Sequence, residues 1–346
     1  MTADDDSRDN ADVKRGSFDH IPVLLTEVLE VTAPSDGDVI VDATFGAGGY
    51  TRAILEAANC RVIAFDRDPS AINAAEGVSR DFPGRFDFVQ APFAELDQHL
   101  AEPVDAVVFD IGVSSMQLDD ADRGFSFMSP GPLDMRMFAA RGNVPEDGPD
   151  AAHLVNTLEA DDLADLIFHL GEERRARQIA RAIVRERETA PLTTTTALAD
   201  LVARVYGRPP RDGRHPATRT FQALRIAVND ELRQLAQALY AAETMLRPGG
   251  RLVVVTFHSL EDRIAKRFFT VRSGRTSGGS RHRPEMIELS RPSFRLVNHR
   301  PLTPGNEEVT QNPRARSAKL RWGIRTEASA PPPDYEGLGL PGWHPP

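Results

Sequence analysis

The sequence predicts a Rossmann-like α/β fold: a doubly wound, mostly parallel sheet with an antiparallel edge strand and an inserted all-helical domain. Three observations predict this fold. Short apolar runs alternate with helical stretches from residue 39 to residue 110, which is typical of a parallel sheet covered by helices on both faces. The alternation then stops, and residues 150–206 show only helical periodicity. Strand-like runs return after residue 250, so the helical segment is expected to interrupt one sheet domain.

The first predicted strand and the loop after it lie at the centre of this fold. Residues 39–41 are β-branched, which is typical of a strand buried on both faces. Asp42 ends the strand, and residues 51–58 have a helical pattern. The glycines between them allow a tight turn and a close approach of the backbone to a ligand. They are Gly46, Gly48 and Gly49.

Asp66 indicates what this loop binds. It ends the second predicted strand, residues 61–65, and lies twenty residues after Gly46, where a carboxylate can hold both hydroxyls of a ligand ribose. The loop is G-x-G-G rather than G-x-G-x-x-G, and it lacks the Gly-Lys-Ser/Thr of a phosphate-binding loop. Asp42 is poorly placed for a pyrophosphate and well placed for an ammonium group. The pattern therefore favours a nucleoside with a cationic amine and no phosphate, and S-adenosylmethionine has these parts.

The other elements of the sheet domain follow in order along the chain. Just before the fifth strand we expect one long helix, because an apolar stripe runs from Phe221 to Leu239 at helical spacing. The remaining elements are a helix from Pro69 to Ala75, a strand over residues 86–90, a helix after residues 91–95, a strand over residues 104–109, a strand over residues 251–257 with a helix after it, and a pair of antiparallel edge strands at residues 294–297 and 319–324.

The domain boundaries follow from these elements. Residues 117–150 are rich in Gly and Pro and have a loop-like pattern, and helical patterns follow at residues 161–170, 172–187 and 194–205. We assign residues 1–16 to a disordered acidic arm, 17–136 and 214–326 to the discontinuous sheet domain, 137–213 to the helical insertion, and 327–346 to a flexible tail rich in Pro and Gly.

Composition is that of a soluble globular protein and leaves nucleic acid open as a partner. The net charge is −10, but acidic residues gather in the N-terminal arm and residues 263–325 are strongly basic. The longest apolar runs are strand-sized, so we expect no membrane partner. The first residues lack the basic and apolar regions of a signal peptide, and a single cysteine suits a reducing compartment. We therefore expect a cytoplasmic protein.

The end of the fourth strand is a second candidate site. Asp110, Ser114 and Gln117 bring a carboxylate, a hydroxyl and an amide to the ligand crevice, where they could face an adenine amine or a target amine. Other chemistries have less support. His258 and Ser259 lack the G-x-S-x-G turn of a serine hydrolase, and the histidines and the cysteine show no zinc-ligand spacing, so we predict no metal.

Two basic stretches are candidates for nucleic-acid contact. Residues 312–321 pack several Arg and Lys residues beside a predicted edge strand, which favours contact with phosphates. The helix over residues 172–187 carries Arg on its polar face. Phosphate contact and a solvated face with i,i+4 ion pairs explain this second pattern about equally well.

Several stretches, in order from about residue 18 to residue 325, closely resemble those of one known family, the bacterial methyltransferases that act on N4 of a cytidine in small-subunit ribosomal RNA. The stretches are His20-Ile-Pro-Val-Leu-Leu, Asp42-Ala-Thr-Phe-Gly-Ala-Gly-Gly, Asp66-Arg-Asp-Pro, Asp110-Ile-Gly-Val-Ser-Ser, Gln117-Leu-Asp-Asp, Arg123-Gly-Phe-Ser-Phe, Gly131-Pro-Leu-Asp-Met-Arg-Met, Gly171-Glu-Glu-Arg, His215-Pro-Ala-Thr-Arg-Thr-Phe-Gln-Ala, Phe257-His-Ser-Leu-Glu-Asp-Arg and Asn312-Pro-Arg-Ala-Arg-Ser.

The resemblance implies a methyltransferase sheet with a helical insertion that binds RNA, and S-adenosylmethionine as the cofactor. It implies methylation of the exocyclic N4 of a cytidine in the decoding region, on free RNA or on an assembling small subunit. Tyr50 stands where the family usually has His, and Met116 where it usually has Pro. The implied cofactor contacts are Gly48, Gly49, Tyr50, Asp66, Phe93, Asp110 and Gln117.

The residues leave some questions open. Asp110 and Ser114 are assigned as catalytic only from their position after the fourth strand. A nicotinamide oxidoreductase remains an alternative, although it would be expected to have G-x-G-x-x-G, and so does a ribosome-binding protein without catalysis. The sequence also leaves open whether the protein forms a homodimer.

Overall fold

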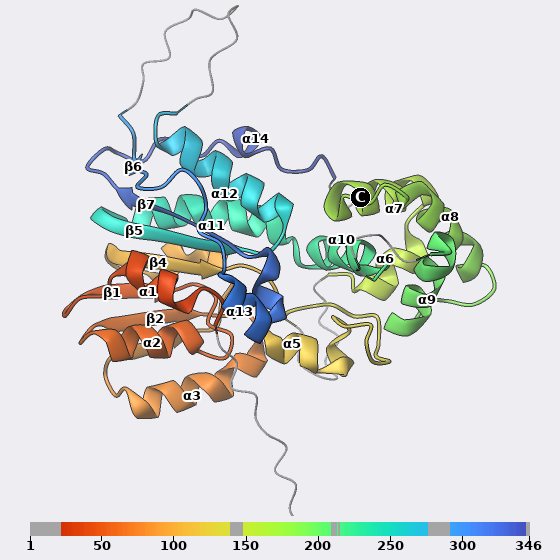
Figure 1. The fold of residues 1–346 in the computed structure, drawn as a ribbon, viewed down its shortest axis with the longest axis horizontal. Coiled ribbons are helices and arrows are strands. Elements are labelled where there is room, and N and C mark those ends of the chain that lie inside the picture. Colours follow the sequence, from red (N-terminus) through yellow and green to blue (C-terminus); the bar gives the residue numbers. More distant parts are fainter. Residues whose placement is uncertain (1–21, 139–147, 209–212, 214, 276–290, 344–346) are drawn as a thin grey trace, which may run out of the picture.

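The computed structural model describes residues 22–138, 148–208, 213, 215–275 and 291–343. Within these residues, seven strands form one sheet in the order β3-β2-β1-β4-β5-β7-β6 (Figure 1). β7 pairs antiparallel with β5 and β6, and all other pairs are parallel, which confirms the predicted fold class. The strands are β1 (Val39–Asp42), β2 (Arg61–Phe65), β3 (Phe86–Val89), β4 (Val104–Asp110), β5 (Leu246–Thr256), β6 (Phe294–Arg295) and β7 (Lys319–Arg325).

Alternating side chains of these strands enter two separate cores, one on each face of the sheet. Ile40 lies in one core and Val41 in the other, because successive side chains of a strand point to opposite faces. One face is covered by α1 (Leu25–Thr32), α2 (Gly49–Ala57) and α3 (Ile72–Asp81), and the other by α4 (Leu96–His99), α11 (Glu231–Met245) and α12 (Ser259–Arg272) (Figure 1). This burial on both faces explains why the β1 sequence is continuously apolar.

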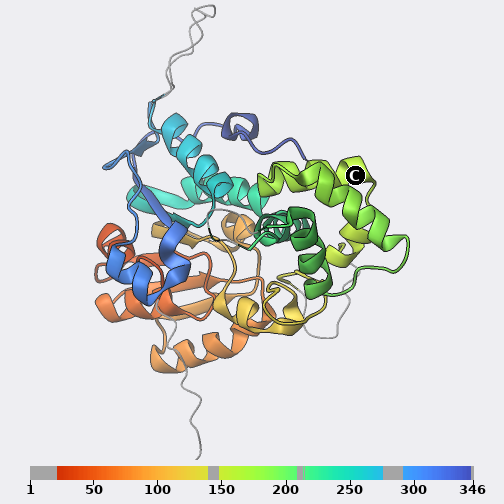
Figure 2. The ribbon, with the colours of Figure 1, turned by 45° about the vertical axis from the view of Figure 1, so that its right-hand side comes forward.

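A helical lobe lies beside the sheet domain (Figure 2). It contains α6 (Ala151–Thr157), α7 (Ala160–Gly171), α8 (Ala176–Arg187) and α9 (Thr195–Tyr206), close to the predicted helices. α10 (Thr218–Asn229) packs against α7. A Cβ added to Gly171 would lie 2.5 Å from the carbonyl oxygen of Arg219, so glycine permits this close helix contact.

The single long helix expected over residues 221–239 is wrong. The chain forms α10 and α11, which are separated at Asp230, a residue in the left-handed region with φ of 51°. Asp and Asn adopt this conformation more readily than other residues with a Cβ, so Asn229-Asp230 suits the point where one helix ends and the next begins. Each of the two helices buries one apolar side, so the apolar spacing continues through the break. The periodicity of the sequence therefore does not reveal the change of direction.

The C-terminal segment, expected to be a flexible tail, instead packs on the sheet domain as far as the structure describes it. The Tyr240 hydroxyl donates to the carbonyl of Asp334 over 2.7 Å, and Arg272 donates to the carbonyl of Pro331 over 3.0 Å. α14 (Tyr335–Leu338) buries Leu338 completely against the core. The few side chains that anchor this segment stand among Pro and Gly residues, so the sequence pattern does not predict their packing. The predicted acidic arm, residues 1–16, lies outside the described residues.

Candidate active site

A pocket lies at the carboxyl ends of β1, β2 and β4. The strand order places β1 between β2 and β4, and this reversal of strand order is where open α/β sheets bind ligands. The pocket brings together most of the residues predicted from the sequence. Those that line it are Gly49, Tyr50, Asp66, Phe93, Asp110, Ser114 and Gln117.

Gly48 is the predicted cofactor residue that does not line the pocket. It has φ of +82° and caps α2, and a Cβ there would lie 2.9 Å from the ring of Phe45. Gly48 therefore sets the conformation of the glycine loop without lining the pocket. Gly49 faces Pro22, whose Cγ would lie 2.3 Å from an added Cβ, so the glycine allows Pro22 to close over the pocket.

Asp66 is held at the pocket edge by two backbone amides. The N–H of Gly46 donates to its Oδ2 and the N–H of Asp68 to its Oδ1, each over 2.8 Å. Burial nevertheless raises the pKa of Asp66 to about 6. The carboxylate therefore links the glycine loop to the end of β2, and it stands where a ligand ribose would meet both.

Asp42, expected to meet an ammonium group, does not line the pocket. It is fully buried, its Oδ2 accepts from the Thr51 hydroxyl over 2.7 Å, and its Oδ1 accepts from the N–H of Thr44 over 3.2 Å. Burial raises its pKa to about 6. Asp42 thus ties β1 to α2 beneath the loop, and the expected direct contact with the ligand amine is wrong for this geometry.

Asp68 forms a buried network that the sequence did not reveal. Its carboxylate accepts from Arg123, with Nη2 and Oδ2 separated by 2.9 Å, and from the side-chain amide of Gln117 over 2.7 Å. Arg123 also donates to the carbonyls of Arg136 and Met137, each over 3.1 Å. The guanidinium and the amide hold the pKa of Asp68 below its usual range. The network fixes the loop carrying Met137, which lines the pocket.

Gln117 and Ser114 stabilise the loop after β4 through their own side chains. They form a capping box at α5 (Ser115–Asp119): the N–H of Gln117 donates to the Ser114 hydroxyl, and the N–H of Ser114 donates to the Gln117 side-chain oxygen over 3.0 Å. Met116 lies within this helix, so the capping box sets the loop shape without the proline usual in the family. Much of the hydrogen-bonding capacity of Gln117 is therefore used within the protein.

Asp110 differs from these residues because one of its oxygens is unused. Its Oδ1 is buried and has no hydrogen-bond partner among the described residues, while its N–H donates to Thr44 over 2.7 Å. Burial, together with the charges of Asp42 and Glu261, raises the pKa of Asp110 well above its usual range. The Oδ1 atom itself is shielded from solvent, but Asp110 lines the pocket, so its carboxyl group is suited to a donor on a ligand.

Tyr50 and Phe93 contribute in different ways. The Tyr50 side chain is buried, and its hydroxyl donates to the carbonyl of Val23, so it anchors the segment that closes the pocket. The Phe93 ring packs edge-on against Phe109 with a centroid distance of 5.8 Å and forms part of the apolar pocket wall. The tyrosine that replaces the family's usual histidine thus has a packing role.

Among the other residues that line the pocket, four with large side chains were not predicted as cofactor or catalytic residues: Arg67, Met137, Phe257 and Arg314. Arg67 donates to the carbonyl of Asn229 at the end of α10 over 3.3 Å. The sequence contained a signal for all four, since each lies inside a stretch that carried the family resemblance. Met137 comes from the loop that Arg123 holds in place.

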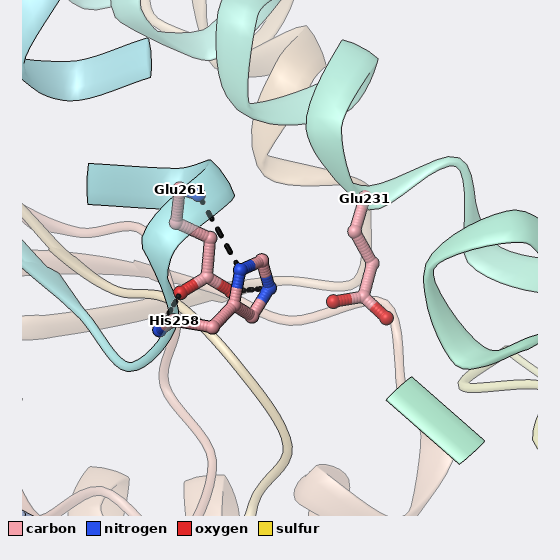
Figure 3. Close-up of side chains that lie close together, drawn as sticks. All are labelled: Glu231, His258 and Glu261. Atoms are coloured by element: carbon pink, nitrogen blue, oxygen red, sulfur yellow. Dashed lines mark hydrogen bonds and ion pairs between the residues drawn. The ribbon is translucent and has the colours of Figure 1, made fainter. Parts of the chain in front are cut away.

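Glu231, His258 and Glu261 lie close together beside Phe257 (Figure 3). Arg225 lies between the two carboxylates: its Nε and Nη2 donate to Glu231 over 2.8 Å, and its Nη2 lies 3.9 Å from Glu261. His258 Nδ1 accepts from the N–H of Glu261, and its Nε2 lies 2.8 Å from Glu261 Oε1. A guanidinium therefore already serves as the cation that joins α10, α11 and α12.

The pocket suits S-adenosylmethionine. Asp66 offers a carboxylate for the ribose hydroxyls, Phe93 an apolar surface for the adenine, and the open loop at Gly46 exposes backbone at the start of α2. Asp110 lines the pocket and offers its carboxyl group to an amine. The site contains no phosphate-binding lysine loop, so the residues present fit a nucleoside sulfonium better than a dinucleotide.

We predict that Asp66→Ala weakens binding of S-adenosylmethionine by about 1–3 kcal/mol, because the two ribose hydroxyls lose their acceptor. Wild-type affinity should also fall as the pH drops through about 6, since a protonated carboxyl is the poorer acceptor for two hydroxyls. The variant should lack this pH dependence. Titration calorimetry from pH 5 to pH 8 measures both, with Asp97→Ala on exposed α4 as the control. An unchanged dissociation constant would refute the assignment of Asp66.

Comparison with known proteins shows which proteins this chain is similar to. Proteins named ribosomal RNA small subunit methyltransferase H are similar to this chain: that of Azorhizobium caulinodans is 57% identical over 94% of this chain and 93% of its own, and that of Parvibaculum lavamentivorans is 55% identical over 93% and 94%. A solved structure described as an rRNA methylase from Streptococcus thermophilus covers 88% of this chain and 94% of its own, with 12% identity and a TM-score of 0.39, which is too distant to support the argument.

Within the described residues, no helix has the length and apolarity needed to span a membrane. The model of the MraW methylase family matches residues 17–326, which include every strand of the sheet, the helical lobe and the whole lining of the pocket. The chain therefore belongs to the MraW methylase family.

Proposed function

We propose that this protein transfers a methyl group from S-adenosylmethionine to the exocyclic N4 of a cytidine in small-subunit ribosomal RNA, in its decoding region. The observation that carries the proposal is the identity of more than half of the residues over nearly the whole chain to proteins named ribosomal RNA small subunit methyltransferase H. The pocket at the ends of β1, β2 and β4 supports it, because its donors and acceptors fit the cofactor of such an enzyme.

The reaction requires orientation more than activation of a strong nucleophile. The cofactor supplies an electrophilic methyl group on sulfur. The lone pair of N4 is delocalised into the cytosine ring, so the protein must hold the amine in line with that methyl group, and such positioning can contribute on the order of 7–11 kcal/mol. Asp110 is suited to this task by its place in the pocket, because its carboxyl group in the ionised form can accept a hydrogen bond from the amine and then its proton.

The target cytidine must leave its stack to reach the pocket, which costs a few kcal/mol unless that RNA is already single-stranded. We propose that the helical insertion, residues 137–213, forms the other wall of the RNA cleft. α8 presents the exposed arginines Arg177, Arg181 and Arg185, and Arg174 is exposed just before this helix. The lobe is also tied to the catalytic domain, since Glu172 accepts from Arg263 of α12 over 2.7 Å and from the Ser259 hydroxyl.

The basic run at residues 312–321 separates into two parts in the structure. Lys319 lies 2.9 Å from Asp262 and is held in an ion pair, whereas Arg314 and Arg316 are exposed on the 3₁₀ turn Pro313–Ser317. Arg314 pairs with Asp119 over 2.9 Å and also lines the pocket. The exposed pair is therefore the better candidate for phosphate contact.

We predict that Arg314→Ala combined with Arg316→Ala weakens RNA binding and reduces the dependence of log affinity on log salt by about 1.4, or roughly 0.7 for each contact to a single strand. The single variant Arg316→Ala, which leaves the pocket residue Arg314 in place, should keep its affinity for S-adenosylmethionine. Filter binding of RNA between 50 and 200 mM salt measures this slope. Arg61→Ala is the control, because Arg61 pairs with an exposed acid in the same way but lies at the start of β2. An unchanged slope would mean that the two arginines do not meet phosphate.

The proposed function is tested by mapping modified cytidines in small-subunit RNA from cells with and without the gene. One N4-methylated cytidine should lose that methyl group when the gene is absent and regain it when the gene is restored. A complemented strain carrying Asp110→Asn should not regain it. An identical modification pattern in all strains would contradict the proposal and favour a ribosome-binding protein without catalysis.

A further inference from the structure

A second pocket lies between α12, the outer side of β7 and the segment before Leu302. It is separate from the cofactor pocket and shares no lining residue with it. The lining is basic and aromatic, and no acidic side chain is part of it within the described residues. The residues that carry the argument are Lys266, Phe269, Arg275, Arg300, Arg321 and Trp322.

The charges of this pocket are only partly balanced. Arg321 pairs with Asp262 over 2.7 Å. Arg275 contacts the imidazole of His299 over 2.7 Å, and an imidazole carries no negative charge that could balance the guanidinium. Lys266 and Arg300 are exposed at the rim. A pocket lined by several cations and no acid attracts an anion. In RNA this anion is the backbone phosphate, which Lys and Arg side chains bind.

An aromatic surface lies beside these cations. Trp322 is half-buried, and its indole N–H has no hydrogen-bond partner among the described residues. Phe269 lines the same pocket from the other face of the sheet, since it belongs to the core beneath α12, whereas Trp322 packs on the core beneath α1. Basic groups next to an accessible aromatic ring are the usual combination for single-stranded nucleic acid, in which bases stack on the ring and phosphates meet the cations.

Two elements connect this pocket to the cofactor pocket. β7 is one of them: Lys319 pairs with Thr256, next to Phe257 of the cofactor pocket, and Trp322 lies three residues further along. α12 is the other, because it begins at Ser259 and reaches Lys266 after about 10 Å at 1.5 Å per residue. One RNA strand could therefore span both pockets.

We propose that this second pocket binds a nucleotide of the single-stranded RNA that flanks the target cytidine. Lys266 and Arg300 meet its phosphates, and the base stacks on Trp322. The proposal rests on the proposed function, since it assigns a place to the RNA strand that leaves the active site. It also explains why a strongly acidic protein carries a basic C-terminal third.

The tryptophan fluorescence of the protein offers a direct test. The chain has two tryptophans, Trp322 and Trp343, so the Trp343→Phe variant reports on Trp322 alone. Titration with a single-stranded ribosomal RNA oligonucleotide containing the target cytidine should quench this fluorescence, and cytidine monophosphate at the same nucleotide concentration should quench it far less. Absence of quenching by RNA that binds the protein would overturn the proposal. Equal affinity for the mononucleotide would overturn it too, because the pocket would then be a small-molecule site.

A charge variant provides the second measurement. Lys266→Ala combined with Arg300→Ala should reduce the slope of log affinity against log salt by about 1.4 and leave S-adenosylmethionine binding and the melting temperature unchanged. Arg80→Ala, an exposed arginine on α3 at the other edge of the sheet, is the matched control. A slope equal to that of the control would refute the assignment. The proposed function fails separately, if the wild-type enzyme binds this RNA and the cofactor but transfers no methyl group.

Discussion

Replacement of Asp68 by alanine is expected to lower the free energy of unfolding by about 3–5 kcal/mol, because it leaves the buried guanidinium of Arg123 without its carboxylate. Asp68 is only 2% exposed and also accepts from the amide of Gln117. The variant should bind S-adenosylmethionine more weakly as well, since the loop carrying Met137 is held through Arg123. Urea unfolding followed by circular dichroism measures the first effect and calorimetry the second.

The double variant Asp68→Ala with Arg123→Met separates charge from packing. Removing both partners takes away the uncompensated charge, so this protein should regain part of the stability lost in Asp68→Ala. Arg52→Ala is the surface control, because its ion pair with Asp81 is exposed and should contribute no more than about 1 kcal/mol. A loss below 1 kcal/mol for Asp68→Ala would contradict the role given to this network.

Asp110→Asn should reduce kcat by about 10²–10⁴-fold, the usual contribution of a positioned proton acceptor. Stability should not fall. In the folded protein the pKa of Asp110 is raised, so the free energy of unfolding decreases as the pH rises above the unfolded pKa of about 4, and an uncharged amide avoids this loss. The melting temperature of the variant at pH 8 should therefore equal or exceed that of the wild type.

Single-turnover methylation and thermal melting on the same preparation test this prediction. Asp81→Asn serves as the control, because Asp81 is an exposed carboxylate at the end of α3. Near-normal single-turnover rates with Asp110→Asn would remove Asp110 from the reaction. A lower melting temperature with normal rates would show that its role is structural.

The sheet was predictable because its signals are local. The apolar run of β1, the glycines after it and the carboxylate that follows β2 each depend on a few neighbouring residues. The structure places the strand, the loop and Asp66 as expected, although Gly48 does not line the pocket. The break between α10 and α11 was not predictable from periodicity, since both halves bury the same apolar spacing. The packed C-terminal segment depends on single contacts such as Tyr240 to Asp334, which leave no pattern in the sequence.

The candidate site likewise contains residues that the sequence predicted and residues whose roles only the fold reveals. Asp66 and Asp110 were found because they end strands, and such positions converge at one edge of a parallel sheet. Asp42 also ends a strand, but its oxygens turn towards Thr51 and Thr44, a choice that depends on side-chain packing. The network of Asp68, Gln117 and Arg123 joins residues up to 55 positions apart, so only the folded chain brings its members together.

The central claim is methyl transfer to a cytidine amine of small-subunit RNA, and one measurement tests it most directly. Purified protein is incubated with S-adenosylmethionine carrying a labelled methyl group and with small subunits or their RNA from cells lacking the gene, and the RNA is then digested to nucleosides. We expect label in N4-methylated cytidine at one position, appearing about 10²–10⁴-fold more slowly when the enzyme carries Asp110→Asn. Label in a different nucleoside, or no label although the protein binds both cofactor and RNA, would contradict it.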